Sequence, residues 1–377
     1  MDFSLNEEQR AIAEMAGSLF ADHCSDEHMT ASLRSGAAFD RELWRKVVDT
    51  GLNKLLLTES VGGSGLGFIE MSLVLQAQGR ALANVPLWQS QLATATMLRF
   101  RGSFAPALMA KLIRGEAIAA LSLGGLFRAH GLSLRAKKSR ESWTLNGMVA
   151  AVPLGAQADL ALLVVEVEGG PRLAAVELRG SQIVVSEGTG TNGERVADLR
   201  FSDTPIAGEC LLPEDALSWL EPRAIASVAS LQLGVSERQV ERTVEYIGER
   251  VQFGRTIAAF QAVQMKMADC FIRREVLRTS LWQLCYRLDA GVGVEAQALA
   301  TLFHCCETGQ WVGHAAQHVH GGVGVDRSYP MHRYLLWSRE LGMTLGGPNA
   351  TLARLGQWLA DNDKLGWKYD LKEHQKI

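Results

Sequence analysis

Hydrophobic positions in the first third of the chain recur with a helical period. Ser4 and Glu7 have the spacing of a capping box. Apolar residues then follow at i, i+3, i+4 and i+7, the pattern of one buried helical face: Ile12, Met15, Ala16 and Leu19. Similar segments cover residues 44–52 and 71–82, with a glycine-rich break at residues 61–67. The pattern predicts a helical bundle over residues 1–115.

The period changes to that of β-strands after about residue 116. Short apolar or alternating runs predict strands at residues 143–145, 160–167, 173–178, 183–185 and 196–201. Tight turns are predicted at Asn146-Gly147, at residues 169–171 and at residues 188–193, because Asn and Gly tolerate positive φ. Residues 116–215 are therefore predicted to form a small antiparallel β domain.

Helical spacing returns after Pro222, which we place at the start of a helix, and persists to the end of the chain. The strong breaks in this region are Gly321-Gly322 and Gly346-Gly347. Residues 216–377 are thus predicted to form a second helical domain, and the chain as a whole belongs to the α+β class.

Composition narrows the class of protein. Of the 377 residues, 47% are hydrophobic and 21% are charged, as in soluble globular proteins. The 38 Lys and Arg residues against 41 Asp and Glu residues give a net charge of −3, so no basic field favours nucleic acid or an anionic membrane. The six cysteines show no CxxC pair, and no leader or membrane-length apolar run is evident. We expect reduced thiols, no disulfide, no membrane insertion and a cytoplasmic location.

Two motifs carry the strongest functional signal. Residues 250–257 read Arg-Val-Gln-Phe-Gly-Arg-Thr-Ile, and Phe260-Gln261, Gln264 and Ala268-Asp269 follow; residues 317–324 read Gln-His-Val-His-Gly-Gly-Val-Gly. They resemble the RxQFG…FQxxQxxxAD and QxxGGxG signatures of the acyl-CoA dehydrogenase family. Residues 58–66 are similar to the PExYGGxGL segment of that family. The resemblance extends over essentially the whole chain and implies an N-terminal helical bundle, a small β-barrel-like middle domain and a C-terminal four-helix bundle.

The resemblance implies FAD as cofactor, an acyl-CoA as substrate and an oligomeric protein. In that family FAD lies across a subunit interface, and the arginine of the first motif pairs with the pyrophosphate of the neighbouring subunit's FAD. Arg250 takes that position here, and a guanidinium offers phosphate a planar donor fork that stays charged at any working pH. The resemblance also places these residues at the cofactor: Gln252, Phe253, Ile257, Phe260, Gln317, Gly321, Gly322 and Asn349.

The catalytic base of the family has no counterpart at its usual positions. The family reaction removes the α-proton of the thioester with a glutamate while hydride leaves Cβ for the flavin N5. The resemblance puts the base position on Leu345, or in some members on Ala224. Glu221 is a reserve base, although an acid at a helix N-terminus is more simply explained by the helix dipole.

The flavin-ring pocket also departs from the family. A tryptophan and a threonine are expected after Asn146-Gly147, but the chain has Ala151 and then Pro153, which lacks both a hydroxyl and an N–H. At the end of the preceding strand only Ser122 matches. The chain therefore keeps residues that act on a neighbour's FAD and lacks those that act on its own.

This pattern resembles the base-lacking subunit of heterotetrameric acyl-CoA dehydrogenases of steroid and bulky acyl-CoA degradation. We expect a homo- or heterotetramer, the second with a catalytic acyl-CoA dehydrogenase subunit, and an electron-transfer flavoprotein as acceptor. Two alternatives remain: a flavin-dependent monooxygenase on the same fold, which needs no α-proton base, and a flavin-free binding or scaffold subunit.

Two further clusters are interpreted as structural. Glutamates at i, i+4 spacing favour a solvated helix face: Glu237, Glu241, Glu245 and Glu249. His304-Cys305-Cys306 and the histidines near residue 318 lack HExxH or CxxC spacing, so no metal site is predicted.

Overall fold

The computed structural model describes residues 4–100, 104–126, 132–139, 142–179 and 182–362. The chain divides into two compact units. Unit 1 contains residues 1–29, 68–83 and 225–377, and unit 2 contains residues 30–67 and 84–224. The division of the chain into domains 1–115, 116–215 and 216–377 stays a prediction.

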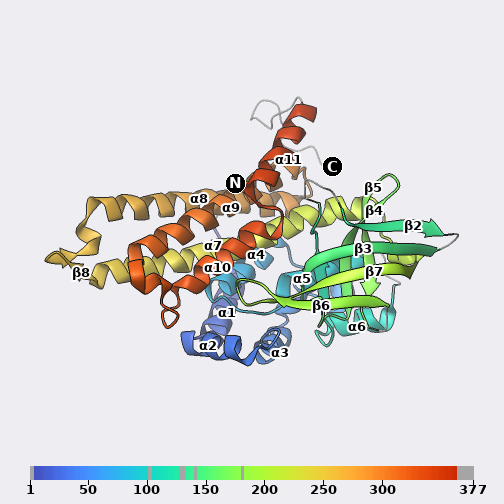
Figure 1. The fold of residues 1–377 in the computed structure, drawn as a ribbon, viewed down its shortest axis with the longest axis horizontal. Coiled ribbons are helices and arrows are strands. Elements are labelled where there is room, and N and C mark those ends of the chain that lie inside the picture. The colour runs from blue at the N-terminus through green and yellow to red at the C-terminus, as the bar shows by residue number, and fades with distance from the viewer. Residues whose placement is uncertain (1–3, 101–103, 127–131, 140–141, 180–181, 363–377) are drawn as a thin grey trace. The chain divides into compact units, whose positions relative to one another are not determined.

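Unit 1 is built from long helices and one short hairpin (Figure 1). Its elements are α1 (Glu7–His23), α4 (Phe68–Arg80), the later part of α7 (Asp215–Glu249), β8 (Val251–Gln252), β9 (Arg255–Thr256), η4 (Ile257–Ala259), α8 (Gln261–Ala290), α9 (Glu295–His320), η5 (Gly321–Val325), α10 (Met331–Thr344) and α11 (Gly347–Asp361). Helix α9 packs against α8, α10 and α11. The breaks predicted at Gly321-Gly322 and Gly346-Gly347 are confirmed, since they end α9 and begin α11.

The first helix begins two residues later than predicted. Its capping box is formed by Asn6 and Gln9: Asn6 Oδ1 accepts from Gln9 N (2.8 Å), and Gln9 Oε1 accepts from Asn6 N (3.1 Å). The prediction of Ser4 and Glu7 is wrong because Asn-x-x-Gln makes the same reciprocal bonds. Met15 is 39% exposed, and Phe20 takes its place on the buried face.

Two glycines set the approach of α4 to α7. A Cβ at Gly79 would lie 2.2 Å from Leu231 O, and a Cβ at Gly234 would lie 2.0 Å from Gln76 O. The backbones therefore touch where neither helix can carry a side chain. This contact fixes the segment of α7 that leads to Arg250.

Unit 2 combines short helices with a mixed sheet. Its helical elements are α3 (Arg41–Asp49), η1 (Leu52–Lys54), η2 (Glu59–Val61), α5 (Leu87–Phe100), α6 (Pro106–Ile113) and η3 (Gly208–Cys210). Its strands are β1 (Ala119–Ser122), β2 (Leu134–Ser139), β3 (Ser142–Pro153), β4 (Leu160–Val167), β5 (Gly170–Glu177), β6 (Ile183–Thr189) and β7 (Arg195–Ala207). Helix α2 (Asp26–Ser35) and α7 each contribute residues to both units.

The sheet has the order β1-β4-β2-β3-β7-β6, and β5 also pairs with β4. The expectation of a purely antiparallel unit is wrong, because β1 and β2 each run parallel to β4. The turns predicted at residues 169–171 and 188–193 are confirmed by the antiparallel pairs β4 with β5 and β6 with β7.

Asn146-Gly147 does not form the predicted turn, because β3 continues through it. The register with β7 shifts between Leu145 and Gly147, which marks a β-bulge. Gly147 has φ +121°, and a Cβ there would lie 1.9 Å from Ser133 O. Asn146 Nδ2 donates to Asp203 Oδ1 (2.9 Å), and Asn146 Oδ1 accepts from Asp203 N (2.9 Å). The same residue types that suit a turn here bend a long strand.

Helix α7 begins at Asp215, so Pro222 lies inside it and not at its start. Glu221 is therefore in the second turn of the helix, and the helix-dipole explanation offered for it is wrong. In the part of the chain that is described, no helix is both long and apolar enough to cross a bilayer. All six cysteines are free thiols.

Candidate functional site

The first motif forms a short arm at the end of α7. Arg250 follows the helix, and its carbonyl accepts from Ile257 N (2.9 Å), which closes the β8–β9 hairpin. The turn uses positive φ at Phe253 (54°) and Gly254 (78°). The Arg250 side chain is exposed, and its guanidinium has no hydrogen-bond or ion-pair partner among the described residues. The arm thus presents an uncompensated cation.

Aromatic side chains sit beside this cation. Phe253 is 92% exposed, and its ring meets Phe260 edge-on with centroids 6.2 Å apart. The guanidinium of Arg255 lies 4.1 Å from the centre of the Phe260 ring. A nearly fully exposed phenylalanine at positive φ is costly in an isolated surface turn, so the arm is shaped to be covered by a ligand or a second chain.

The second motif forms another arm where α9 ends. Gly321 adopts φ 59° and ψ −137°, a region that only glycine enters without strain. A Cβ at Gly321 or at Gly322 would meet nothing within 4 Å among the described residues. The backbone therefore faces open space and can be approached closely.

Gln317 supplies the polar group of this second arm. Both its amide nitrogen and its amide oxygen are screened from solvent, and neither has a partner in the described part of the chain. Gln239 of α7 shares this state, so the Gln317 amide by itself does not mark a ligand. The exposed guanidinium of Arg250 and the open Gly321-Gly322 backbone are the features that fit a phosphate-bearing group.

The two arms rest on one apolar cluster of unit 1. Its buried members are Val240, Ile247, Met267, Cys270, Val312 and Ala315. Ile257 from the first motif and Val319 from the second motif both pack on it. The structure therefore brings together two segments that the sequence separates by about sixty residues.

Two further residues predicted to bind the cofactor are exposed, and Asn349 belongs to neither motif. It is exposed in the first turn of α11. Gln252 is exposed on β8, and its Nε2 donates to Val251 O (2.7 Å). Their predicted roles at the cofactor stay predictions.

Unit 2 contains the residues at which the resemblance places the contacts to the flavin ring, namely Ser122 and residues 151–153. Ala151 N already donates to Asp198 Oδ1 (2.8 Å), and Pro153 has no N–H to offer. Ser122 Oγ accepts from Gly124 N (3.2 Å). The crevice between Gly124, Met148 and Val164 has a volume of about 10 Å³, room for one water at most. This segment offers a flavin ring neither the expected hydroxyl nor a free strand N–H.

The two positions predicted for the base carry no acid and are closed to solvent, and their role stays a prediction. Ala224 is 0% exposed on α7, and Leu345 is 2% exposed at the end of α10. Glu221 is half-buried on α7 and already has an interaction partner.

The glutamate stripe is not simply solvated. The side chain of Glu237 is only 12% exposed and lies 3.2 Å from Arg80 Nη1 and 2.7 Å from Arg278 Nη2. Burial opposes the charge of Arg80, but the hydrogen bond and charge of Glu241 outweigh it and raise the pKa of Arg80. The sequence pattern could not reveal this network because Arg80 lies 157 residues before Glu237.

The histidine and cysteine cluster packs as structure. Burial raises the pKa of Cys306 to about 12, and its Sγ donates to Gly342 O (3.1 Å). Within the described ranges, no three His, Cys, Asp or Glu side chains are grouped to hold a metal ion.

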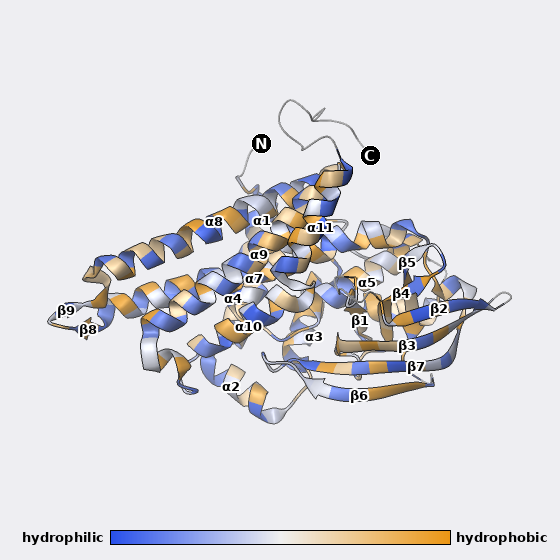
Figure 2. Cartoon of the chain, turned by 45° about the horizontal axis from the view of Figure 1, so that its top comes forward, coloured by the Kyte–Doolittle hydropathy of each residue, from blue (hydrophilic) through white to orange (hydrophobic). Residues whose placement is uncertain are grey.

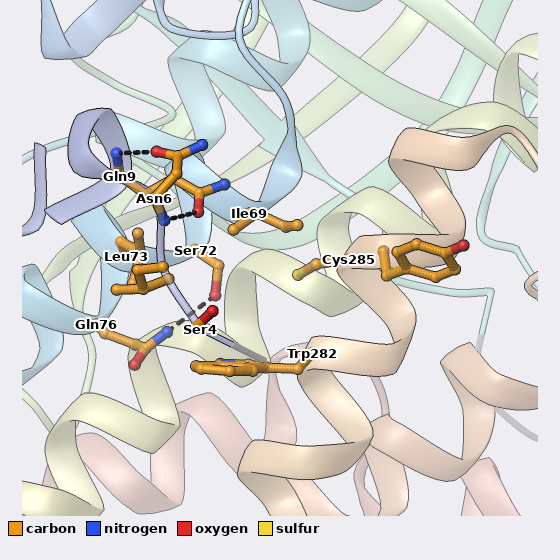
Figure 3. A pocket seen from close by; sticks show the side chains of 11 residues that line it. Ser4, Asn6, Gln9, Ile69, Ser72, Leu73, Gln76, Trp282 and Cys285 are labelled. Carbon is orange, nitrogen blue, oxygen red and sulfur yellow. Dashed lines mark hydrogen bonds between the residues drawn. The ribbon is translucent and has the colours of Figure 1, made fainter. Parts of the chain in front are cut away.

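A separate pocket in unit 1 lies between the start of α1, α4 and α8 (Figure 3). Its volume is about 220 Å³, and Trp282 and Cys285 line one side. Ser72 Oγ, which also lines the pocket, accepts from Gln76 Nε2 (3.0 Å) and from Ser230 Oγ (2.9 Å). None of the residues predicted to bind cofactor or to act in catalysis lines it.

Long helices that carry two separated motifs, together with a mixed sheet, define the fold, and the comparisons with known proteins identify its class. The family models of the acyl-CoA dehydrogenase N-terminal domain and C-terminal domain match residues 6–104 and 223–358. The chain belongs to the acyl-CoA dehydrogenase family, whose members are oxidoreductases acting on CH–CH groups with FAD as cofactor. The predicted family, fold class, enzyme class and cofactor are confirmed.

Several relatives match along nearly their full length. The chain is 32% identical over 374 residues to acyl-CoA dehydrogenase FadE27 of Mycobacterium tuberculosis, covering 96% of this chain and 99% of the relative. Among solved structures, the ChsE4-ChsE5 complex from Mycobacterium tuberculosis is 31% identical with a TM-score of 0.89, covering 96% and 100%. A variant of the Tcur3481-Tcur3483 steroid ACAD is 32% identical with a TM-score of 0.88, covering 95% and 99%.

Proposed function

We propose that this chain is the FAD-contributing, base-lacking subunit of a heteromeric acyl-CoA dehydrogenase. The observation that carries the proposal is the contrast between the two arms and the base positions. Arg250 and the Gln317 amide have no side-chain partner among the described residues, whereas positions 224 and 345 hold buried apolar residues. The assembly converts an acyl-CoA thioester to the enoyl-CoA, and a partner chain supplies the carboxylate.

The arms bind the neighbour's cofactor through charge and close approach. Arg250 offers a bidentate fork to the pyrophosphate, and the Gln317 amide supplies a donor and an acceptor beside it. Gly321 and Gly322 let the backbone come close to the dinucleotide, while Phe253 covers it from water. FAD, when bound, supplies the hydride acceptor for the substrate Cβ.

The proton transfer is assigned to the partner chain. No carboxylate of this chain occupies either base position, and Ala151 N–H is committed to Asp198. Abstraction of the α-proton needs a carboxylate within hydrogen-bond reach of the substrate. The chain therefore acts in binding and orientation, and its partner in proton removal.

Exposed apolar residues support an assembly of chains. On α8 they include Met265, Phe271, Ile272, Val276 and Tyr286. Figure 2 shows orange and blue segments mixed along this helix, in place of one wholly polar outer face. Several large apolar side chains exposed on one helix favour its association with another chain.

Two relatives support the substrate class and the heteromer. One of the solved structures described above is a complex of two differently named chains, and another is a steroid ACAD. We propose a bulky, steroid-type acyl-CoA as substrate and an electron-transfer flavoprotein as electron acceptor.

The test is flavin content per chain, read from visible absorbance against protein concentration. The protein purified alone is expected to be colourless and to acquire FAD when co-expressed with a catalytic acyl-CoA dehydrogenase subunit. One FAD per chain in the isolated protein would contradict the proposal. It would indicate a self-sufficient homomer or a monooxygenase on this fold, which an assay with acyl-CoA and an artificial acceptor separates.

Arg250→Ala tests the role of the first arm in the assembled protein. Loss of a charge-assisted bond is worth about 1.5 to 3 kcal/mol, so FAD affinity should fall roughly 10- to 150-fold. Arg255→Ala, in the same hairpin, is the control for a general loss of positive charge and should have a much smaller effect. Equal effects of the two variants, or none for Arg250→Ala, would remove the pyrophosphate role.

A further inference from the structure

The two arms are joined by a cluster of three rings, two of which lie outside both motifs. His320 is the last residue of α9, and its ring stacks on Tyr246 of α7 with centroids 4.3 Å apart and planes 20° apart. Tyr329 completes the cluster, with its centroid 5.4 Å from that of His320. We call these residues, Tyr246, His320 and Tyr329, the aromatic clasp.

Each ring of the clasp adjoins a functional element. Tyr246 O accepts from Arg250 N (2.9 Å), so the tyrosine lies one helical turn before the proposed pyrophosphate ligand. His320 directly precedes Gly321. The stack between Tyr246 and His320 therefore connects the arm that carries the cation to the arm that carries the glycines.

The hydrogen bonds of His320 close the glycine loop at its base. His320 Nδ1 lies 2.8 Å from Ala316 O, and Nε2 lies 3.2 Å from the Tyr329 hydroxyl, nine residues later in the chain. A carbonyl oxygen only accepts, so Nδ1 carries the hydrogen and Nε2 of the neutral ring accepts from Tyr329. Residues 321–328 are thus held as a loop whose two ends are bonded to each other.

The loop also packs closely against the end of α9. A Cβ at Gly324 would lie 3.0 Å from His320 Cβ and 3.1 Å from Gln317 Nε2. His320 is only 3% exposed, so it cannot rotate away without displacing the loop. The position of the unpartnered Gln317 amide therefore depends on the same histidine.

We propose that His320 and Tyr329 are positioning residues that hold the Gly321-Gly322 backbone and Gln317 in register with Arg250 for a neighbour's FAD. The inference rests on the proposed function, since it concerns the same dinucleotide site. The clasp touches neither substrate nor the reacting atoms; it sets the spacing between two ligand-binding arms that come from different helices.

The test measures the FAD dissociation rate from the holo-assembly by the recovery of flavin fluorescence. Tyr329→Phe removes only the hydroxyl and is expected to speed FAD release about threefold to tenfold, the worth of one neutral hydrogen bond. His320→Gln should speed release about tenfold, since it removes the stack as well. Tyr246→Phe is the matched control: its hydroxyl has no hydrogen-bond partner among the described residues and its ring remains, so release should be unchanged.

Two further measurements separate positioning from mere support of the fold. His304→Gln replaces another half-buried histidine of α9, one that takes no part in the clasp, and should leave FAD release unchanged. In the Arg250→Ala background the effect of Tyr329→Phe should shrink, because one arm no longer binds and spacing no longer matters.

Each result then has a defined meaning. A Tyr329→Phe effect on FAD release that is fully additive with that of Arg250→Ala would show a purely structural role. So would a loss of stability in the FAD-free protein, measured as a lower melting temperature, that accounts for the faster release. No change in release for Tyr329→Phe and His320→Gln would overturn the clasp. If Arg250→Ala itself leaves FAD binding intact, the proposed function fails, and that outcome is distinct from failure of the clasp alone.

Discussion

Polar groups differ in their hydrogen bonding between the two arms of unit 1 and residues 151–153 of strand β3 in unit 2. In the arms, the Arg250 guanidinium and the Gln317 amide have no partner within the described ranges of the chain. In the strand segment, Ala151 N–H is bonded to Asp198, and Pro153 has no N–H. The exposed Arg250 guanidinium is open to a ligand, whereas the strand segment already uses its N–H group within the chain. The difference agrees with the proposed site, in which a second chain completes the arms.

The largest expected effect on stability comes from placing a glutamate at position 345, one of the two positions predicted for the catalytic base. Leu345→Glu places a carboxylate at a site that is 2% exposed, and we expect it to lower the free energy of unfolding by at least about 3 kcal/mol. Leu345→Gln, of equal size without charge, should cost less. Denaturant unfolding measures both. No dehydrogenase activity should appear in the isolated chain, and a gain of enoyl-CoA formation would contradict the contrast between the two regions.

The two glycines of the second arm are expected to have different roles. Gly321 is required by its backbone conformation, and Gly322 by the close approach of the ligand. Gly321→Ala must adopt φ 59° and ψ −137°, which costs roughly 1 to 3 kcal/mol of folding free energy. Gly322→Ala has ordinary φ and free space, so the free energy of unfolding should not change. It should nevertheless weaken FAD binding in the assembly, because a methyl group then stands where the dinucleotide approaches.

Thermal unfolding and FAD titration of the two variants check this difference. Equal FAD affinity for Gly322→Ala and the parent protein would show that the ligand does not approach this backbone. A loss of stability in Gly322→Ala equal to that of Gly321→Ala would show that both glycines serve the turn alone.

The smallest expected effect is the pH dependence of the clasp. Burial lowers the pKa of His320, although the hydrogen bond to Ala316 O works in the opposite direction. The folded protein therefore binds the proton less readily than the unfolded chain, whose histidine titrates near 6.5. The stability that the neutral ring contributes is present above that pH and is lost as pH falls below it, by at most about 1.4 kcal/mol per pH unit.

His320→Gln should remove this part of the acid sensitivity. The groups that face the clasp are the hydroxyl of Tyr329, the ring of Tyr246 and, around Tyr329, Arg242, Glu245 and Asp26. Denaturant unfolding between about pH 5 and pH 7 measures the slope. His304→Gln reports separately on the other α9 histidine whose pKa burial lowers. A slope that His320→Gln leaves unchanged would mean that this ring does not titrate in that range.

Local signals were good predictors where the residue type itself dictates the geometry. The helix breaks at Gly321 and Gly346 and the hairpin turn at residues 169–171 are confirmed, because glycine relieves a backbone constraint wherever it occurs. Asn146-Gly147 was misread as a turn, because a bulge in a long strand requires the same residue types. Pro222 was misread as a helix start, because a proline can also sit within a helix.

The pattern of residues along the sequence did not predict side-chain contacts between residues that are far apart in the chain. The periodic glutamates of α7 gave no hint that Glu237 is paired with Arg80 and Arg278. The clasp could not be predicted either, since Tyr246 lies on α7, His320 ends α9 and Tyr329 lies in the turn before α10. One signal could have been noted: a histidine and a tyrosine flank the glycine motif within nine residues of each other.

By itself, the sequence predicted the family and the cofactor, which are confirmed, because these depend on which residue types stand in each motif. It also predicted that positions 224 and 345 lack a base, and that stays a prediction. Only the tertiary structure decided that Gln317 is screened from water without a partner, that Ala151 is already bonded to Asp198 and that the arms meet through the clasp. Burial and partnership are properties of contacts between distant segments, and no single segment carries them.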